Sequence, residues 1–479
     1  MKAMKKAMKK TMKQVRSWRM TTTTRHRPLP RPITVFLLLS ILAAAGGGCR
    51  SFSEVDEVAH VFTIAVDKST INKVKVGIRV PIARLVGKVQ GQAIGGGGGE
   101  QELYLITSTD APSILSGINA MQTYIERQIS LEHARLLLIS EEFAREGLEE
   151  EITPILRFPE TRSNMYVAIS KGDPIRLLME NRPFLDVNIA KYVELVHRMA
   201  DLTGYSELPT VNRFYNHMRS PGREAVAAIL AVNEEVLAQQ EKEEQKKAGG
   251  LITLDLEGEE EEKADEGEKG QPDKAPEPPA RTPGSTSAGK IPREGGSVVE
   301  WLGLAVFKGD RMVGELNGNE SLAYRLLTGT LAEGVLTVAE PQNPKRLITV
   351  NLKPGRPPAI KTFFQDQIAV VQVDLLLEVN VDSITSGDDL EQSEAVHRIE
   401  EAVKLSLEAW LAAVVRKTQD WGTDIFGFGE HFRRHYASWQ DWDNAGWSDK
   451  FKTADIRINL RVMMRRPGLL IQTESSSVK

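Results

Sequence analysis

The sequence predicts an exported α+β protein of several domains, and three observations support this. The chain has 479 residues, more than one hydrophobic core accommodates, so its length predicts two or three domains. Short segments with alternating apolar residues, typical of strands, are mixed with longer segments that have apolar residues at helical spacing. An apolar run near the N-terminus precedes the chain's single cysteine, Cys49.

The N-terminal segment has the order of an export signal. Residues 1–32 carry only basic charged side chains, and the apolar run 35–45 follows. This run is too short to cross a hydrocarbon core about 30 Å thick but suits a secretory signal. Residues 46–48 are glycines and lead directly to Cys49, an arrangement similar to a bacterial lipobox. We therefore predict a signal peptide over 1–48, with palmitate-type lipid on Cys49 as the only attached group and no other cofactor.

Other interpretations of the N-terminus remain open. Gly46 stands where a lipobox usually has an aliphatic residue, so a plain secretory signal or an uncleaved apolar anchor is the alternative. The basic leader is long for a signal, and Met20 offers an alternative start. A nucleic-acid-binding arm is the rival interpretation of the basic leader. Export would remove such an arm together with the signal.

The first part of the mature chain alternates between strand and helix patterns. We expect strands at 61–67, 73–80, 102–108, 134–140 and 166–170. Helices are expected after a cap at Asp110 and over 141–146 and 149–158. Residues 95–99 are glycines that predict a flexible hairpin tip, because no Gly-Lys-Ser/Thr follows to make a phosphate-binding loop. This order predicts a sheet covered by helices.

The middle of the chain changes composition sharply. Residues 183–232 have a helical pattern interrupted by glycine and prolines. Residues 234–296 are rich in Glu, Lys, Gly and Pro and nearly free of aromatic residues, so they cannot bury enough apolar area to fold. We predict a disordered acidic insertion there, and a cation-loading acidic tail is the functional alternative.

Order is expected to resume at residue 298. Strands are predicted at 301–307, 311–316, 347–352, 369–381 and 456–464. A short helix is expected at 322–327 and a strong amphipathic helix at 393–417. The apolar stripe of the long helix predicts one buried face, formed by Ile399, Val403, Leu407, Trp410, Leu411 and Val414.

Catalytic and metal motifs are weak. His431 and His435 are four residues apart, but Phe432 replaces the Glu of a zinc-protease motif. The stretch 441–446 begins like a calcium loop, but Lys452 occupies the twelfth position, where Glu is required. Cys49 lies at the export boundary, which excludes cysteine catalysis. We therefore predict no catalytic residues, no metal site and no enzyme activity.

The segment 421–447 is unusually rich in tryptophan and phenylalanine, interleaved with glycines. Aromatic side chains at this density form either a ligand platform or a local core. We favour the core. The two possibilities differ in whether the rings are buried.

Several stretches, in this order, resemble the Ger(x)C family, the lipoprotein C subunits of spore nutrient-germinant receptors. The stretches that carry the resemblance are 54–68, 131–147, 155–162, 303–316 and 424–429, followed by Trp439 and Trp447. The most specific is Asp-Ile-Phe-Gly-Phe-Gly at 424–429. The sequence departs from the family pattern at Gly46, at Arg50 (commonly Trp), at the glycine tip and at the acidic insertion.

The resemblance implies three mixed α/β domains, which we place at 49–180, 181–344 and 345–479, with the disordered insertion at 236–297. It implies a lipid-anchored position on the outer face of the inner spore membrane. It also implies assembly with A- and B-type integral membrane subunits in nutrient-triggered germination, with no nucleic acid involved. The alternative function is a solute-binding lipoprotein that captures a small nutrient directly, and a lipid-anchored hydrolase is a third hypothesis.

Overall fold

The computed structural model describes residues 57–82, 104–182, 189–250, 283–340, 343–384 and 393–466. The chain divides into Met1–Val55 and a compact unit, Asp56–Lys479, and every described residue belongs to the second. The predicted signal peptide, Cys49 and the glycine tip at 95–99 lie outside the described residues. Within the described ranges, no helix has both the length and the apolar character needed to cross a membrane.

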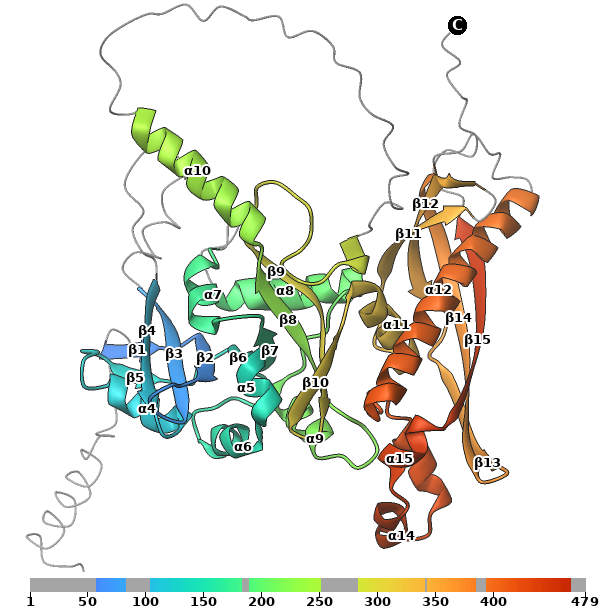
Figure 1. Ribbon diagram of the computed structural model, residues 1–479, viewed down its shortest axis with the longest axis horizontal. Helices are drawn as coiled ribbons and strands as arrows, with labels where there is room; N and C mark the ends of the chain where they lie inside the picture. The colour runs from blue at the N-terminus through green and yellow to red at the C-terminus, as the bar shows by residue number, and fades with distance from the viewer. Residues whose placement is uncertain are drawn as a thin grey trace, which may run out of the picture. The chain divides into compact units, whose positions relative to one another are not determined.

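An eight-stranded mixed sheet forms the first part of the fold (Figure 1). Its strands, in sheet order, are β10 (Arg311–Leu316), β9 (Val299–Lys308), β8 (Val226–Val232), β7 (Tyr166–Ser170), β6 (Leu136–Ser140), β2 (Thr63–Lys68), β3 (Val74–Pro81) and β4 (Tyr104–Ala111). The four central strands are parallel, and antiparallel strands complete both edges. A separate parallel pair joins β1 (Val58–His60) to β5 (Gln128–Ser130).

Helices cover both faces of this sheet, as expected when central strands are buried on both sides. One face packs on α4 (Ile114–Met121), α5 (Glu141–Glu146), α6 (Glu149–Arg157) and α9 (Val211–Met218). The other face packs on α7 (Pro174–Glu180), α8 (Ile189–Thr203) and the first turn of α10 (Glu234–Gly250). Two apolar cores therefore sandwich the sheet, which confirms the predicted sheet covered by helices.

A second sheet carries the C-terminal part of the fold. It contains β11 (Gly334–Glu340), β12 (Asn343–Pro354), β13 (Ala359–Gln365), β14 (Ile368–Ile384) and β15 (Asp455–Arg466), and β15 pairs in parallel with β14. Its inner face packs on α11 (Gly318–Thr328) and on α12 (Ser393–Trp421). The predicted stripe of α12 is buried, except that Trp410 is partly buried. The α+β class is therefore confirmed.

The helical interpretation of residues 183–232 is wrong at its end. Residues 226–232 form β8, a central strand of the large sheet. Their sequence, Val-Ala-Ala-Ile-Leu-Ala-Val, is apolar throughout, and a short apolar run does not distinguish a buried strand from a buried helix. Residues 226–232 form a strand because the central strands of this sheet are buried on both faces, which an apolar run satisfies.

The predicted disorder of 236–297 is wrong at both ends of the segment. Its first part continues helix α10, because Val236 is fully buried and the Asn233 side chain accepts a 3.2 Å hydrogen bond from the Val236 N–H. Its last part, from residue 283, lies against the sheet, where the buried Glu300 carboxylate accepts hydrogen bonds from Gly289 N (2.7 Å) and Arg293 Nε (3.0 Å). Single anchoring side chains thus order residues that composition alone assigns to disorder. Residues 251–282 lie outside the description.

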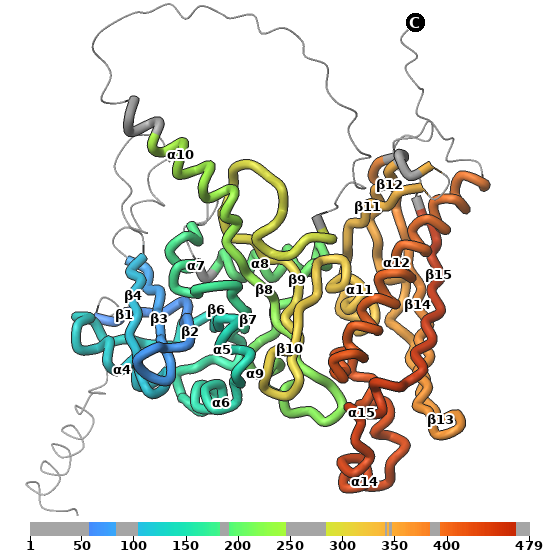
Figure 2. Tube along the Cα trace, viewed as in Figure 1, coloured from blue at the N-terminus to red at the C-terminus, as the bar shows by residue number. Residues whose placement is uncertain are grey.

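The insertion connects two neighbouring antiparallel strands. β8 and β9 are neighbours in the sheet (Figure 2). β8 ends at Val232 and β9 begins at Val299, and these two residues are paired. Asn233 N donates a 2.7 Å hydrogen bond to Val298 O, which closes the neck of the insertion. The loop therefore leaves and re-enters the sheet at one place, and the sheet does not depend on its length.

The predicted boundary at residue 180 falls inside the continuous eight-stranded sheet, which combines strands from both sides of it. The division into three domains stays a prediction.

The sequence did not indicate strands β11 and β13. The expected cap at Asp110 is also wrong: Asp110 lies in β4, and Ser113 caps α4 in a capping box.

Candidate functional site

The aromatic segment after α12 folds into a compact core. It contains three short helices, α13 (Phe428–Phe432), α14 (Trp439–Asn444) and α15 (Trp447–Lys452), and a single 3-10 turn (Arg433–His435). The indole of Trp447 lies 4.7 Å from the Phe432 ring and 6.0 Å from the Trp442 indole, measured between centroids. The buried rings are Phe426, Phe428, Phe432, Trp442, Trp447 and Phe451. This confirms the interpretation as a core.

Trp439 is the exception within this segment. Its side chain is 65% exposed, and the Arg433 guanidinium lies 4.3 Å from its ring centroid. A cation over an indole face is a favourable surface contact. Trp439 therefore packs on the outside of the core and contributes little to it.

Asp424 organises the Asp-Ile-Phe-Gly-Phe-Gly loop. Its carboxylate is buried, and Oδ1 accepts hydrogen bonds from the backbone N–H groups of Phe426 (3.1 Å) and Gly427 (3.0 Å). Oδ2 accepts from Gly429 N (2.7 Å) and Trp447 Nε1 (2.8 Å). Burial raises the pKa of Asp424 to about 6, although these donors oppose the shift. One carboxylate thus fixes both the loop backbone and the central tryptophan.

The glycines of this loop meet specific steric needs. Gly427 has φ +80, in the left-handed region that favours glycine. A Cβ atom on Gly429 would lie 2.5 Å from the Trp447 ring and 2.7 Å from the Gly222 Cα. The close approach at Gly429 brings the loop against the chain segment that precedes β8.

A second carboxylate faces this contact from the large sheet. Glu224 N donates a 2.8 Å hydrogen bond to Asp424 O, and a Glu224 carboxylate oxygen accepts from Gly309 N at 2.9 Å. Burial raises the pKa of Glu224 to about 7; Asp424 adds to the shift, while Gly309 N and Lys308 oppose it. The β9–β10 turn, the segment before β8 and the Asp424 loop therefore meet at Glu224.

Arg325 links α11 to the end of α8. Its guanidinium is 2% exposed and donates to the carbonyls of Ala200 (2.5 Å), Ser206 (3.0 Å) and Thr330 (2.7 Å). It also forms a 2.5 Å ion pair with Asp201. Four acceptors surround this buried charge, as a structural charge requires, and Nε is the one of its nitrogens without a partner among the described residues.

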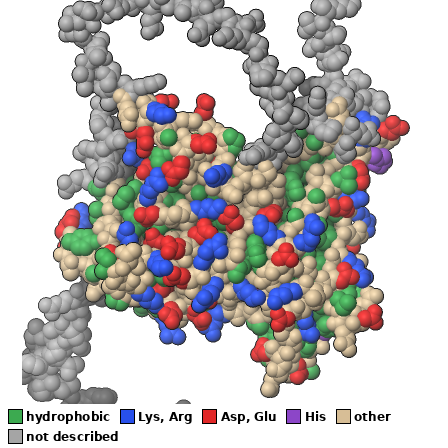
Figure 3. All heavy atoms as spheres, in the orientation of Figure 1, with side chains coloured by type: hydrophobic (Ala, Val, Ile, Leu, Met, Phe, Trp, Pro, Cys, Tyr) green, Lys and Arg blue, Asp and Glu red, His purple; other side chains and the backbone are tan. Residues whose placement is uncertain are grey.

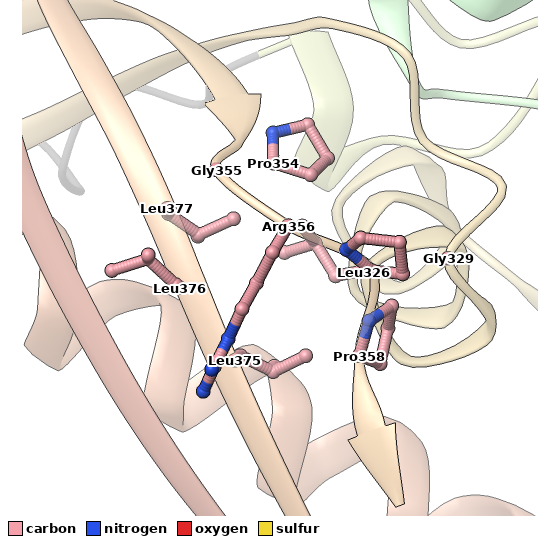
Figure 4. A pocket seen from close by; sticks show the side chains of 10 residues that line it. Leu326, Gly329, Pro354, Gly355, Arg356, Pro358, Leu375, Leu376 and Leu377 are labelled. Carbon is pink, nitrogen blue, oxygen red and sulfur yellow. The ribbon is translucent and has the colours of Figure 1, made fainter.

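A small pocket lies where the β12–β13 connection passes β14 and the end of α11 (Figure 4). Its volume is about 300 Å³, at the lower limit for ligand pockets. The lining residues are Leu326, Gly329, Pro354, Gly355, Arg356, Pro357, Pro358, Leu375, Leu376 and Leu377. The walls are more apolar than polar, and Arg356 is the charged lining residue, so the pocket suits a small group that is mainly apolar. The sequence signal, Pro-Gly-Arg-Pro-Pro at 354–358, was not recognised.

The two histidines of the candidate metal pair lie on different elements. His431 lies in α13 and His435 in the following 3-10 turn, so no continuous α-helix aligns them. His435 Nε2 is 3.0 Å from the Thr362 hydroxyl, and burial lowers the pKa of His431. The described residues contain no cluster of three or more potential metal ligands. Residues 441–446, the calcium-loop candidate, belong largely to helix α14.

The visible face of the described residues carries basic and acidic side chains interspersed, without a large field of one sign (Figure 3). This agrees with the small formal net charge of -4. Fold and sites together describe an α+β protein with two large sheets, in which the buried charges of Asp424 and Arg325 serve its own packing.

Comparison with known proteins gives the class. Residues 51–232 match a family model described as spore germination protein N-terminal domain. Residues 302–468 match one described as spore germination B3/GerAC like, C-terminal. The chain belongs to this Ger(x)C family of spore germination proteins.

Individual relatives are distant. The spore germination protein GerQC of Bacillus cereus is 18% identical over 88% of this chain and 97% of its own length. The putative spore germination protein YfkR of Bacillus subtilis is 26% identical over 41% of this chain, and the match spans about half (48%) of YfkR. The crystal structure of GerBC aligns with TM-score 0.46 and 12% identity over 84% of this chain and 96% of GerBC.

Proposed function

We propose that this chain is the lipid-anchored C subunit of a spore nutrient-germinant receptor. The observation that carries the proposal is that both spore-germination models match in order, at 51–232 and 302–468. Lipid on Cys49 holds the chain at the outer face of the inner spore membrane. There it acts without catalysis, through assembly with A- and B-type integral membrane subunits.

The position of Cys49 supports the anchor. It follows the apolar run 35–45 and precedes residue 51, where the first family match begins. A single acyl chain binds a membrane only weakly, whereas the two chains of a diacylglyceryl cysteine give stable attachment. The predicted lipid attachment residue is thus close in sequence to the part of the chain that the family models match.

Direct nutrient capture gains no support from the aromatic segment. Rings of 421–447 exposed in a cleft would have favoured that alternative, but Phe432, Trp442 and Trp447 are buried in a core. An assembly role needs no such cleft.

The assembly is tested by tagging the full chain at its C-terminus and isolating it from spore membranes after mild cross-linking. We expect two integral membrane germination subunits to co-purify. We also expect gene deletion to abolish the response to at least one nutrient. Isolation of the chain without such subunits, with a normal response in the deletion strain, would contradict the proposal.

A further inference from the structure

Arg79 is a buried guanidinium with few acceptors. It lies on β3, and its side chain is 2% exposed. Nη2 donates a 2.9 Å hydrogen bond to Asn181 O. Nε and Nη1 have no hydrogen-bond partner within the described part of the chain. Two donor atoms of a buried cation are thus left without a protein acceptor.

Arg325 shows how this protein treats a structural arginine. Both guanidinium groups are 2% exposed. Arg325 has three backbone acceptors and the carboxylate of Asp201, whereas Arg79 has one backbone acceptor. No ion pair involves Arg79 in the described ranges. Burial of a charge without a counter-ion is strongly unfavourable, so the difference requires an explanation.

The surroundings of Arg79 are polar or aromatic rather than acidic. Its guanidinium carbon lies 4.1 Å from the centroid of the Tyr104 ring. Burial lowers the pKa of Arg79 to about 10, and the groups that oppose this shift are the phenols of Tyr104 and Tyr192. Asn181 is 2% exposed, and its Oδ1 makes no hydrogen bond of good geometry among the described residues, although its side chain interacts with the Tyr192 phenol. Two incompletely bonded polar side chains therefore lie on the same α7-covered side of the sheet.

These groups lie where their elements end. β3 ends at Pro81, β4 begins at Tyr104 and α7 ends at Glu180, next to Asn181. β3 and β4 are the last two strands at one edge of the eight-stranded sheet. A small ion reaches the edge of the sheet with less rearrangement of the protein than it would need to reach the centre of the sheet. A partner's side chain would have to penetrate a surface that leaves Arg79 only 2% exposed.

We propose that Arg79, with Tyr104 and Asn181 beside it, forms a binding site for a small free carboxylate. The planar guanidinium offers N–H donors whose geometry matches a carboxylate better than a spherical anion. The ligand supplies the negative charge that the described residues around Arg79 do not provide. This site goes beyond the receptor role and does not depend on it.

The test uses the full chain in non-ionic detergent, with sodium acetate as the probe and sodium chloride at equal ionic strength as the reference. Thermal unfolding is measured for the wild type, for Arg79→Met and for the control Arg461→Met, which removes an exposed arginine on β15 in the other sheet. We expect saturating acetate to raise the Tm of the wild type and of Arg461→Met by roughly 2–5 °C over chloride. Arg79→Met is expected to show no acetate effect.

If Arg79→Met does not fold, Arg79→Lys replaces it in the acetate test, because lysine keeps the positive charge. It should bind acetate about tenfold more weakly, because lysine lacks the planar donor fork. The proposal is overturned if the wild type shows no saturable effect of acetate. It is also overturned if chloride has the same effect, or if replacing Arg79 leaves acetate binding unchanged.

Discussion

Glu224 N donates a 2.8 Å hydrogen bond to Asp424 O, and this bond joins the two regions that match the family models. Glu224 precedes β8 of the large sheet, and Asp424 organises the loop after α12. Around it, Gly222 and Gly429 approach closely enough to exclude a Cβ atom. The contact couples the packing of the aromatic core to the first sheet.

The Glu224 carboxyl makes this contact sensitive to pH. Burial, reinforced by Asp424, raises its pKa from 4.5 to about 7. Between these values the folded state binds more protons than the unfolded state, so stability falls as pH rises through this window. We expect Glu224→Gln to remove about 2–3 kcal/mol of this pH dependence. The free energy of unfolding of the wild type and of Glu224→Gln is measured with urea at about pH 5 and about pH 8. An equal change of this free energy with pH in both proteins would contradict the assignment.

Gly429→Ala should destabilise the fold by at least about 2 kcal/mol, because overpacking a rigid site forces neighbours to move. The added Cβ meets Trp447 and the Gly222 backbone. Gly446→Ala is the matched control: Gly446 has φ +60 and nothing within 4 Å, so only backbone strain of about 1 kcal/mol is expected. The measurement is the denaturant midpoint of Gly429→Ala and of Gly446→Ala, each compared with the wild type. Equal losses would show that the close approach is not tight.

Arg325→Met should destabilise the protein by about 3–5 kcal/mol. The change leaves the carbonyls of Ala200, Ser206 and Thr330 without this donor, and Asp201 without its ion pair. Arg356→Met, at an exposed position, should stay within about 0.5 kcal/mol of the wild type. Urea unfolding of both variants is the measurement, and a small effect at Arg325 would contradict its structural role.

Replacing residues 251–282 by a ten-residue Gly-Ser linker should leave the fold intact. The neck of the insertion is closed by the Asn233–Val298 hydrogen bond and by the Val232–Val299 pair. Loop length affects stability weakly, by about 0.6 kcal/mol for each doubling. We expect the free energy of unfolding to change by about 1 kcal/mol or less. A large loss would show that the insertion supports the sheet.

Strong local patterns predicted most elements well. The helix at 141–146 and the strands at 166–170 and 311–316 have the predicted bounds, because caps and turn residues mark their ends. β8 was missed because its apolar run fits either structure, and only its neighbours in the sheet decide. The pairing of β8 with β9 across the insertion involves contacts that no local pattern encodes.

The candidate sites were less predictable. The sequence indicated that 421–447 forms a core, but not that Asp424 holds its loop. Arg79 looks like an ordinary strand residue, and only burial reveals its missing acceptors. The 354–358 pocket depends on how β12, β14 and α11 come together.

The most direct test of the anchored-receptor proposal is palmitate labelling of the wild type and of Cys49→Ala. Spore membranes are fractionated, and nutrient-triggered germination is measured in the same preparations. We predict that label and membrane association are lost together in Cys49→Ala and that the nutrient response weakens. A wild-type chain that takes up no label, or a variant that keeps label and germinates normally, would contradict the account.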